Sequence, residues 1–221
     1  MHALRGYVPL LAVPEPVGFY PLNIRYRAAE KENRQPKGIL GDVAITKGPY
    51  NEPGGAYMFY GTASSYIEFR NDGGLDTRLS ITLMCWVQHA GQNGPLFRYG
   101  VSMTGVGMVI GFGKLKCHIV ERSSQSLPLL TTPEVLPALR WVNVAGSYDH
   151  NIGNNLQYIN GHFSISHNIG KGYKIETISQ RVFTGNRSHR DWHFKEKIAE
   201  MKVYNVALNE EQIQTSIRRG S

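Results

Sequence analysis

The sequence is dominated by short runs in which apolar and polar residues alternate, and this period of two restricts most of the chain to β-strands. Residues 156–165 contain two such runs around Asn160-Gly161, a dipeptide that accepts the positive φ angles of a type I′ hairpin turn. Further runs of this kind occupy residues 64–69, 80–87, 94–100, 107–113, 114–121 and 141–148. Many short strands between glycine-rich turns predict an all-β fold, a two-sheet antiparallel sandwich.

The C-terminal segment changes from strand spacing to helical spacing. Alternation in residues 197–204 predicts an apolar strand face made by Ala199, Met201 and Val203, with Glu200 and Lys202 facing the other way. A short helix is expected to follow this strand and to close the domain.

The sequence also predicts where that helix begins. Asn209 is a good N-cap, and Gln212 three residues later completes a capping box. Leu208 and Ile213 occupy the two positions of a hydrophobic staple. Every part of this element has a structural explanation, so the helix itself is not a candidate site.

The length of 221 residues suits one domain with a single core. We interpret residues 1–17 as an N-terminal arm or linker, because prolines interrupt their apolar patch, and residues 18–221 as the domain. The patch is a poor signal-peptide core, so a signal peptide is either absent or already removed. No apolar run approaches the ~20 residues of a membrane-spanning helix, and we expect no membrane insertion.

The two cysteines, Cys85 and Cys117, lack the spacing of a zinc site. They are either a pair of buried thiols or a single disulfide, and the sequence leaves both alternatives open. A glycosylation sequon at residues 186–188 agrees with the disulfide alternative. Together they favour an extracellular setting, either as a secreted protein or as part of a surface protein.

The formal net charge is +7, which suits acidic partners but also serves solubility. The basic residues are spread along the chain without a run of five, and this distribution favours the solubility reading. No nucleic-acid-binding motif is present, so we expect no nucleic-acid partner.

The order of several longer motifs resembles the laminin G-like and pentraxin-like modules of the concanavalin A-like lectin/glucanase superfamily. These motifs occupy residues 18–23, 54–69, 80–87, 141–162 and 197–213. The resemblance implies a jelly-roll sandwich in which the last strand lies beside the first, with a short helix after it. It also implies an extracellular module that binds glycans or proteins, often with calcium.

The spacing of the carboxylates indicates whether the chain could act as a glucanase. Glucanases of this superfamily carry a Glu-x-Asp-x-x-Glu strand, and the chain has no such motif. Its nearest approach is Glu196 and Glu200, which lie roughly 13 Å apart on a strand, too far for an acid–base pair. We therefore expect no enzyme activity.

Calcium is a candidate cofactor, held by oxygen ligands from Asp42, Asn71, Asp72 and Glu200. Relatives of the fold often carry an acid at the position of Glu200. The resemblance is weaker elsewhere, because the Asp that relatives often place after the first strand is Asn23 here. The competing interpretation of Asn71 and Asp72 is turn chemistry without an ion, and it is the one we favour.

Two loops offer candidate ligand-binding residues. In residues 147–155, Asp149 and Asn151 can bond sugar hydroxyls, although such residues also serve a hairpin loop alone. Residues 181–197 concentrate charged and aromatic side chains suited to an acidic glycan: Arg187, His189, Arg190, Trp192 and His193. Core packing is the competing interpretation of the indole, and an exposed loop without metal that of the histidines.

The sequence therefore predicts a non-catalytic, extracellular, lectin-like recognition domain. Its expected partners are glycans or glycosaminoglycans, including acidic or sulfated ones, bound through loops at one rim of the sandwich. The alternative is a protein-interaction or adhesion module of a larger cell-surface protein, with extracellular proteins as partners. A β-glucan hydrolase is the third hypothesis.

Overall fold

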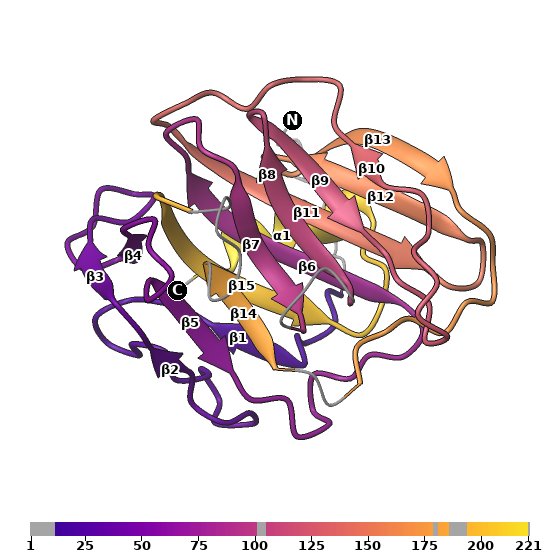
Figure 1. The fold of residues 1–221 in the computed structure, drawn as a ribbon, viewed down its shortest axis with the longest axis horizontal. Coiled ribbons are helices and arrows are strands. Elements are labelled where there is room, and N and C mark those ends of the chain that lie inside the picture. Colours follow the sequence, from indigo (N-terminus) through magenta and orange to yellow (C-terminus); the bar gives the residue numbers. More distant parts are fainter. Residues whose placement is uncertain (1–11, 101–104, 179–180, 186–193, 221) are drawn as a thin grey trace, which may run out of the picture.

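The computed structural model describes residues 12–100, 105–178, 181–185 and 194–220, which form two stacked antiparallel sheets and one helix (Figure 1). The eight-stranded sheet runs in the order β13 (His162–Asn168), β12 (Asn154–Ile159), β11 (Trp141–Asp149), β6 (Ile81–Gln88), β15 (Lys197–Tyr204), β4 (Ala56–Phe59) and β3 (Val43–Thr46), and β1 (Gly18–Tyr20) also pairs with β15. The seven-stranded sheet runs in the order β10 (Leu130–Thr131), β9 (Lys114–His118), β8 (Gly107–Gly111), β7 (Gly94–Tyr99), β14 (Val182–Gly185), β5 (Tyr66–Phe69) and β2 (Ile39–Leu40). This is the predicted jelly-roll sandwich.

The main core lies between the sheets, because alternate residues of each strand point inward and are apolar. Its largest fully buried side chains include Tyr20, Tyr99, Tyr148, Phe59, Phe69 and Phe97. The predicted closure is also confirmed, because β1 pairs with the last strand, β15, in the register Gly18 to Val203. Within the described residues, no helix has the length and apolar character to span a membrane.

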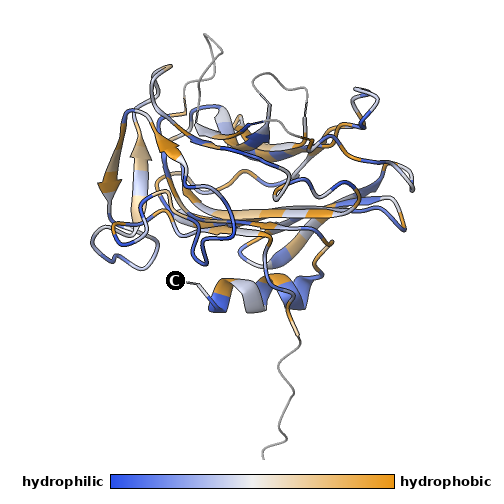
Figure 2. Ribbon diagram, turned by 90° about the horizontal axis from the view of Figure 1, so that it is seen from below, coloured by the Kyte–Doolittle hydropathy of each residue, from blue (hydrophilic) through white to orange (hydrophobic). Residues whose placement is uncertain are grey.

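Helix α1 (Glu210–Arg218) packs outside the eight-stranded sheet, where Figure 2 shows it below the sandwich. The predicted capping box is present, since Asn209 Oδ1 accepts from the Gln212 amide and Gln212 Oε1 from the Asn209 amide. A second apolar cluster joins the helix to the sheet: Val13, Met84, Ala145, Tyr158, Tyr204, Leu208 and Ile213. Val13 belongs to the segment we interpreted as an arm, so residues 12–17 lie against the domain.

Strand β15 departs from strict alternation. A register shift lies between Ala199 and Lys202 in the pairing with β6, and Glu200 adopts a φ of 50°. The inward positions are consequently Ile198, Met201 and Val203 rather than the predicted set that begins at Ala199. Lys202 still faces outward, as expected, but α1 covers it and leaves it only 3% exposed.

Two hairpins have the same turn geometry but different residues. Asn160 and Gly161 join β12 to β13 with φ angles of 52° and 82°, as predicted. Phe112 and Gly113 join β8 to β9 with φ angles of 55° and 72°. Positive φ at the first central position is unfavourable for a bulky side chain, so the second turn breaks a local rule that the first one obeys.

The cysteines are free thiols in the structure, one in each sheet and both buried. Burial raises the pKa of each thiol to about 12, so both are protonated at neutral pH.

Candidate functional site

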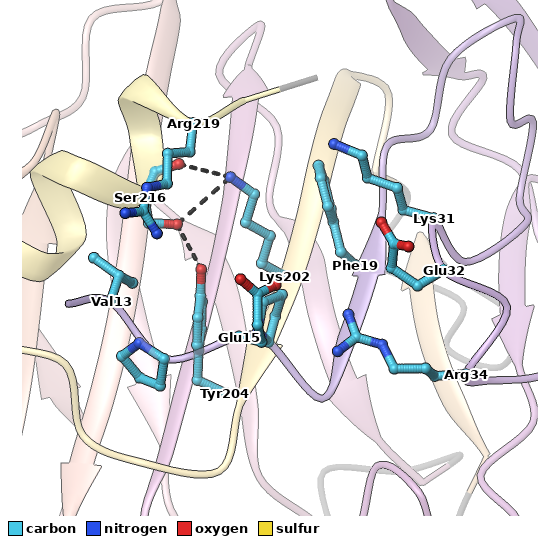
Figure 3. Close-up of a pocket in the computed structure, with 12 residues that line it drawn as sticks. Val13, Glu15, Phe19, Lys31, Glu32, Arg34, Lys202, Tyr204, Ser216 and Arg219 are labelled. Carbon is cyan, nitrogen blue, oxygen red and sulfur yellow. Dashed lines mark hydrogen bonds between the residues drawn. The ribbon is translucent and has the colours of Figure 1, made fainter.

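A pocket with several basic side chains lies where the N-terminal segment, β15 and the end of α1 meet (Figure 3). Its volume is about 180 Å³. We call it the basic pocket, and its lining consists of Val13, Pro14, Glu15, Pro16, Phe19, Lys31, Glu32, Arg34, Lys202, Tyr204, Ser216 and Arg219. These residues come from both ends of the chain, and the pairing of β1 with β15 brings them together.

Lys202 forms the floor of the basic pocket. Its Nζ donates to the Ser216 carbonyl oxygen at 2.7 Å and lies 3.5 Å from Ser216 Oγ and 3.7 Å from Glu200 Oε2. Desolvation lowers the pKa of Lys202, and the nearby Lys31 lowers it further, whereas Glu200 raises it. The same Ser216 hydroxyl meets the Tyr204 hydroxyl at 2.6 Å, so α1 is tied to β15 by polar contacts.

Phe19 on β1 lies between two ammonium groups. The Nζ atoms of Lys31 and Lys202 are 5.0 Å and 4.8 Å from its ring centroid, within cation–π range. The Lys31 amide donates to the Phe19 carbonyl at 2.8 Å, which fixes the lysine beside the strand. The ring therefore stabilises a second positive charge close to a buried one.

Glu30 shapes the loop that carries the remaining basic residues. It is buried, and its carboxylate accepts from the backbone amides of Phe19, Glu32 and Arg34. Arg34 Nη2 is 3.5 Å from the same carboxylate, so this cation is partly compensated. Among the described residues, neither Lys31 nor Arg219 forms an ion pair.

The charge balance of the lining is positive. Lys31, Arg34, Lys202 and Arg219 face two carboxylates, Glu15 and Glu32. The site is open to solvent on one side and has a buried cation on the other. Such an arrangement suits an anion, because a charge held away from bulk water attracts a counter-charge more strongly.

A second depression, the polar hollow, has a volume of about 330 Å³. It is lined by Leu79, Ser80, Asp149, His150, Asn151, Asn205, Val206 and Ala207. Part of its polar surface is used locally, since Ser80 Oγ accepts from the His150 amide and Asp149 Oδ1 from the Asn151 amide. The structure therefore brings the predicted ligand residues Asp149 and Asn151 into one surface hollow.

The other predicted ligand residues are Arg187, His189, Arg190, Trp192 and His193, and they lie outside the described residues. The sequence missed the residues of the basic pocket. Its cations are scattered over residues 31–34 and 202–219 without a motif, and only the pairing of the first and last strands joins them.

The predicted calcium ligands lie on separate elements. The Asp42 amide bonds Ser64 before β5, whereas Asn71 follows β5, so these two are about 20 Å apart along the strand. Asn71 is buried and its side chain accepts from the Gly73 and Leu75 amides, which is turn chemistry. Its neighbour Asp72 is exposed. Glu200 lies in the other sheet, beside Lys202. Within the described residues, no group of three or more His, Cys, Asp or Glu side chains is placed to hold a metal.

The two carboxylates weighed for catalysis face different parts of the molecule. Glu196 is 3% exposed, and burial raises the pKa of its carboxyl to about 8, although the backbone amides of Ala90 and Gln92 lower it. Neither oxygen has a partner of good hydrogen-bond geometry among the described residues. Glu200 instead lies against Lys202 and close to Gly220 at the end of α1.

The two stacked antiparallel sheets define a β-sandwich of the jelly-roll type. The family model for the concanavalin A-like lectin/glucanases superfamily, Laminin_G_3, matches residues 61–214. The chain belongs to this superfamily. Its laminin G-like character agrees with the expectation from the motif order.

No curated protein matches the chain. Several solved structures share its fold. The binding domain of Paraclostridial Mosquitocidal Protein 1 superposes with a TM-score of 0.73 at 14% identity, over 93% of this chain and 52% of that one. The botulinum neurotoxin serotype D binding domain gives 0.72 at 13% identity, over 93% and 51%. The botulinum neurotoxin type G receptor binding domain gives 0.69 at 13%, over 94% and 52%. The chain thus spans about half the length of these structures.

Proposed function

We propose that this protein is a non-catalytic, extracellular recognition module that binds acidic glycans, with an acidic group of the glycan held in the basic pocket. The observation that carries this proposal is the excess of cations around a partly enclosed cavity. Lys31 and Arg219, which form no ion pair among the described residues, are the side chains available to a ligand. Ammonium and guanidinium groups are the donors that sulfate and carboxylate groups favour.

The size of the basic pocket limits what enters it. Its volume is about 180 Å³ and it is open to solvent on one side. That suits one acidic group of a glycan rather than a whole oligosaccharide. The rest of the glycan would then lie on the surface between the N-terminal segment and α1.

Family membership and the structural relatives support a binding role. The superfamily name includes lectins, and the similar structures are binding domains of other proteins. Glu196 and Glu200 do not face a shared space, which supports a module without hydrolase activity. Calcium is also proposed as a cofactor of glycan binding, which is why binding is measured both with calcium and with a chelator.

The test is binding of sulfated, sialylated and neutral oligosaccharides, with calcium or with a chelator. We expect acidic glycans to bind, with an affinity that falls as salt rises. Lys31→Gln and Arg219→Gln should each weaken binding about tenfold, the value of one charge-assisted hydrogen bond. Lys47→Gln, an exposed lysine outside the pocket, makes the same charge change and should have little effect.

Two results would contradict the proposal. One is the absence of binding to all three glycan classes, both with calcium and with a chelator. The other is binding that Asn151→Ala in the polar hollow abolishes while Lys31→Gln and Arg219→Gln leave it intact. That result would move the site to the polar hollow and to ligands without an acidic group.

A further inference from the structure

Three large apolar side chains are exposed at one end of the sandwich. Phe112 is 80% exposed, Leu139 71% and Val135 62%. They lie where β6 and β8 end and β7, β9 and β11 begin, because Gln88 pairs with Trp141 and Gly94 with Ile110. We call these three side chains the apolar tip. Single exposed hydrophobic residues are common, but three on neighbouring loops of one end form a patch.

Hydrogen bonds tie the loops of the apolar tip to one another. The Phe112 amide donates to Asn93 Oδ1, and the Leu136 amide donates to the Gly113 carbonyl at 2.8 Å. The Leu139 amide donates to the His89 carbonyl at 2.7 Å. The buried His89 also bonds the Leu136 carbonyl through Nε2 at 3.0 Å and accepts from the Gly91 amide at Nδ1. The tip is therefore presented on a preorganised platform.

The turn that carries Phe112 gives a second, independent observation. It has the same geometry as the Asn160-Gly161 turn, with φ of 55° against 52° at the first central residue. Asparagine suits that position, whereas phenylalanine is unfavourable there and gains no burial in return. A residue that breaks a local rule without compensation in the fold is expected to serve function.

Basic residues surround the apolar tip. Lys114 and Lys116 follow the turn on β9, and the Lys116 Nζ lies 5.4 Å from the Phe112 ring centroid. Arg140 follows Leu139 and is exposed. Among the described residues, Glu134 is an exposed acid beside the tip, and its carboxylate accepts from the Ser164 hydroxyl. The carboxyl of Glu196, near the Ala90 and Gln92 amides, is buried. The described charged side chains around the apolar tip therefore have a positive net charge.

We propose that the apolar tip inserts shallowly into a lipid bilayer that contains anionic lipids. Projecting aromatic and aliphatic side chains with lysine and arginine behind them match the acyl boundary and the headgroups of such a surface. A protein partner would need a pocket matched to side chains carried on two separate loops, the β8–β9 turn and the β10–β11 loop, whereas a bilayer needs no such matching shape. This proposal departs from the sequence-based expectation of no membrane insertion, because a shallow contact through exposed loops needs no long apolar run. It uses none of the residues of the basic pocket.

The test is sedimentation of the whole chain with vesicles of phosphatidylcholine alone or with phosphatidylserine. We expect binding to the anionic vesicles that weakens at high salt. Phe112→Asn should weaken it tenfold or more, the value of burying one large apolar side chain. Lys114→Gln and Arg140→Gln should each weaken it about fivefold.

Matched controls make the result decisive. Phe112→Asn recreates the Asn-Gly turn, so its melting temperature should equal or exceed that of the wild type while binding falls. Ile152→Asn removes an apolar side chain that is 55% exposed between β11 and β12, at the opposite end of β11 from the tip, and should leave vesicle binding unchanged. Failure of the wild type to sediment with either vesicle, or equal sedimentation of Phe112→Asn, would overturn the proposal.

Discussion

Glu196 predicts an unusual dependence of stability on pH. Its carboxyl is buried at the start of β15 and has a pKa of about 8 in the folded protein, against 4.5 for a free side chain. The folded state therefore holds a proton that the unfolded state has lost whenever the pH lies between these values. Because the unfolded state binds fewer protons there, stability falls as pH rises from about 4.5 to about 8, and it levels off above.

The magnitude follows from the two pKa values. Each pH unit between them costs about 1.4 kcal/mol, so the loss relative to the fully protonated protein reaches about 1 kcal/mol at pH 5 and about 3 kcal/mol at pH 7. Glu196→Gln keeps the shape of the side chain and removes the ionisation. We expect this variant to exceed the wild type by at least ~1 kcal/mol at pH 8, with a smaller difference at pH 5.

The measurement is urea unfolding of both proteins from pH 5 to pH 8, with the difference in unfolding free energy as the observable. The difference is needed because burial lowers the pKa of His118, and that group adds a slope of opposite sign that cancels between the two proteins. A difference for Glu196→Gln that stays flat or shrinks as pH rises would refute the reasoning.

Two further predictions concern packing and capping. Gly146→Ala should destabilise the protein by about 1–3 kcal/mol, because the new Cβ would overlap Cys117 Sγ across the sandwich. In a double-mutant cycle, Cys117→Ala should recover part of that loss. Strictly additive losses of unfolding free energy for the two substitutions would contradict the contact. Asn209→Ala should lower the free energy of unfolding by about 1 kcal/mol, because the side-chain acceptor for the Gln212 amide is lost. Asn209→Gly should lower it by a few tenths, because glycine is a better N-cap residue than alanine. Equal losses for the two variants in thermal unfolding would argue against the cap.

Local patterns predicted most of the fold because their causes are local. Alternation predicted the long strands β6 and β11, and Asn160-Gly161 predicted the hairpin with the observed φ angles. The capping box predicted the first residue of α1. Each of these depends on residues within a few positions, so no knowledge of the distant chain was needed.

The bulge at Glu200 was not predictable in the same way. Its amide donates to the Pro21 carbonyl at 3.1 Å, so the shift is set by the segment after β1, far away in the sequence. The same long-range pairing creates the basic pocket. The cations of the basic pocket are scattered along the chain and form no sequence motif. Sequence analysis therefore placed the candidate ligand-binding residues in the loops at residues 147–155 and 181–197 instead.

Residues that break local rules are not equal as evidence of function. Lys202 is a buried cation, but the Ser216 oxygens and Glu200 surround it, so the fold alone explains why it is tolerated. Glu196 is a buried acid that remains neutral at the cost of stability at higher pH. Phe112 is both strained and exposed, and the cation–π contact of its ring with Lys116 does not bury it. By this comparison the β8–β9 turn is a stronger indication of an external partner than either buried charge.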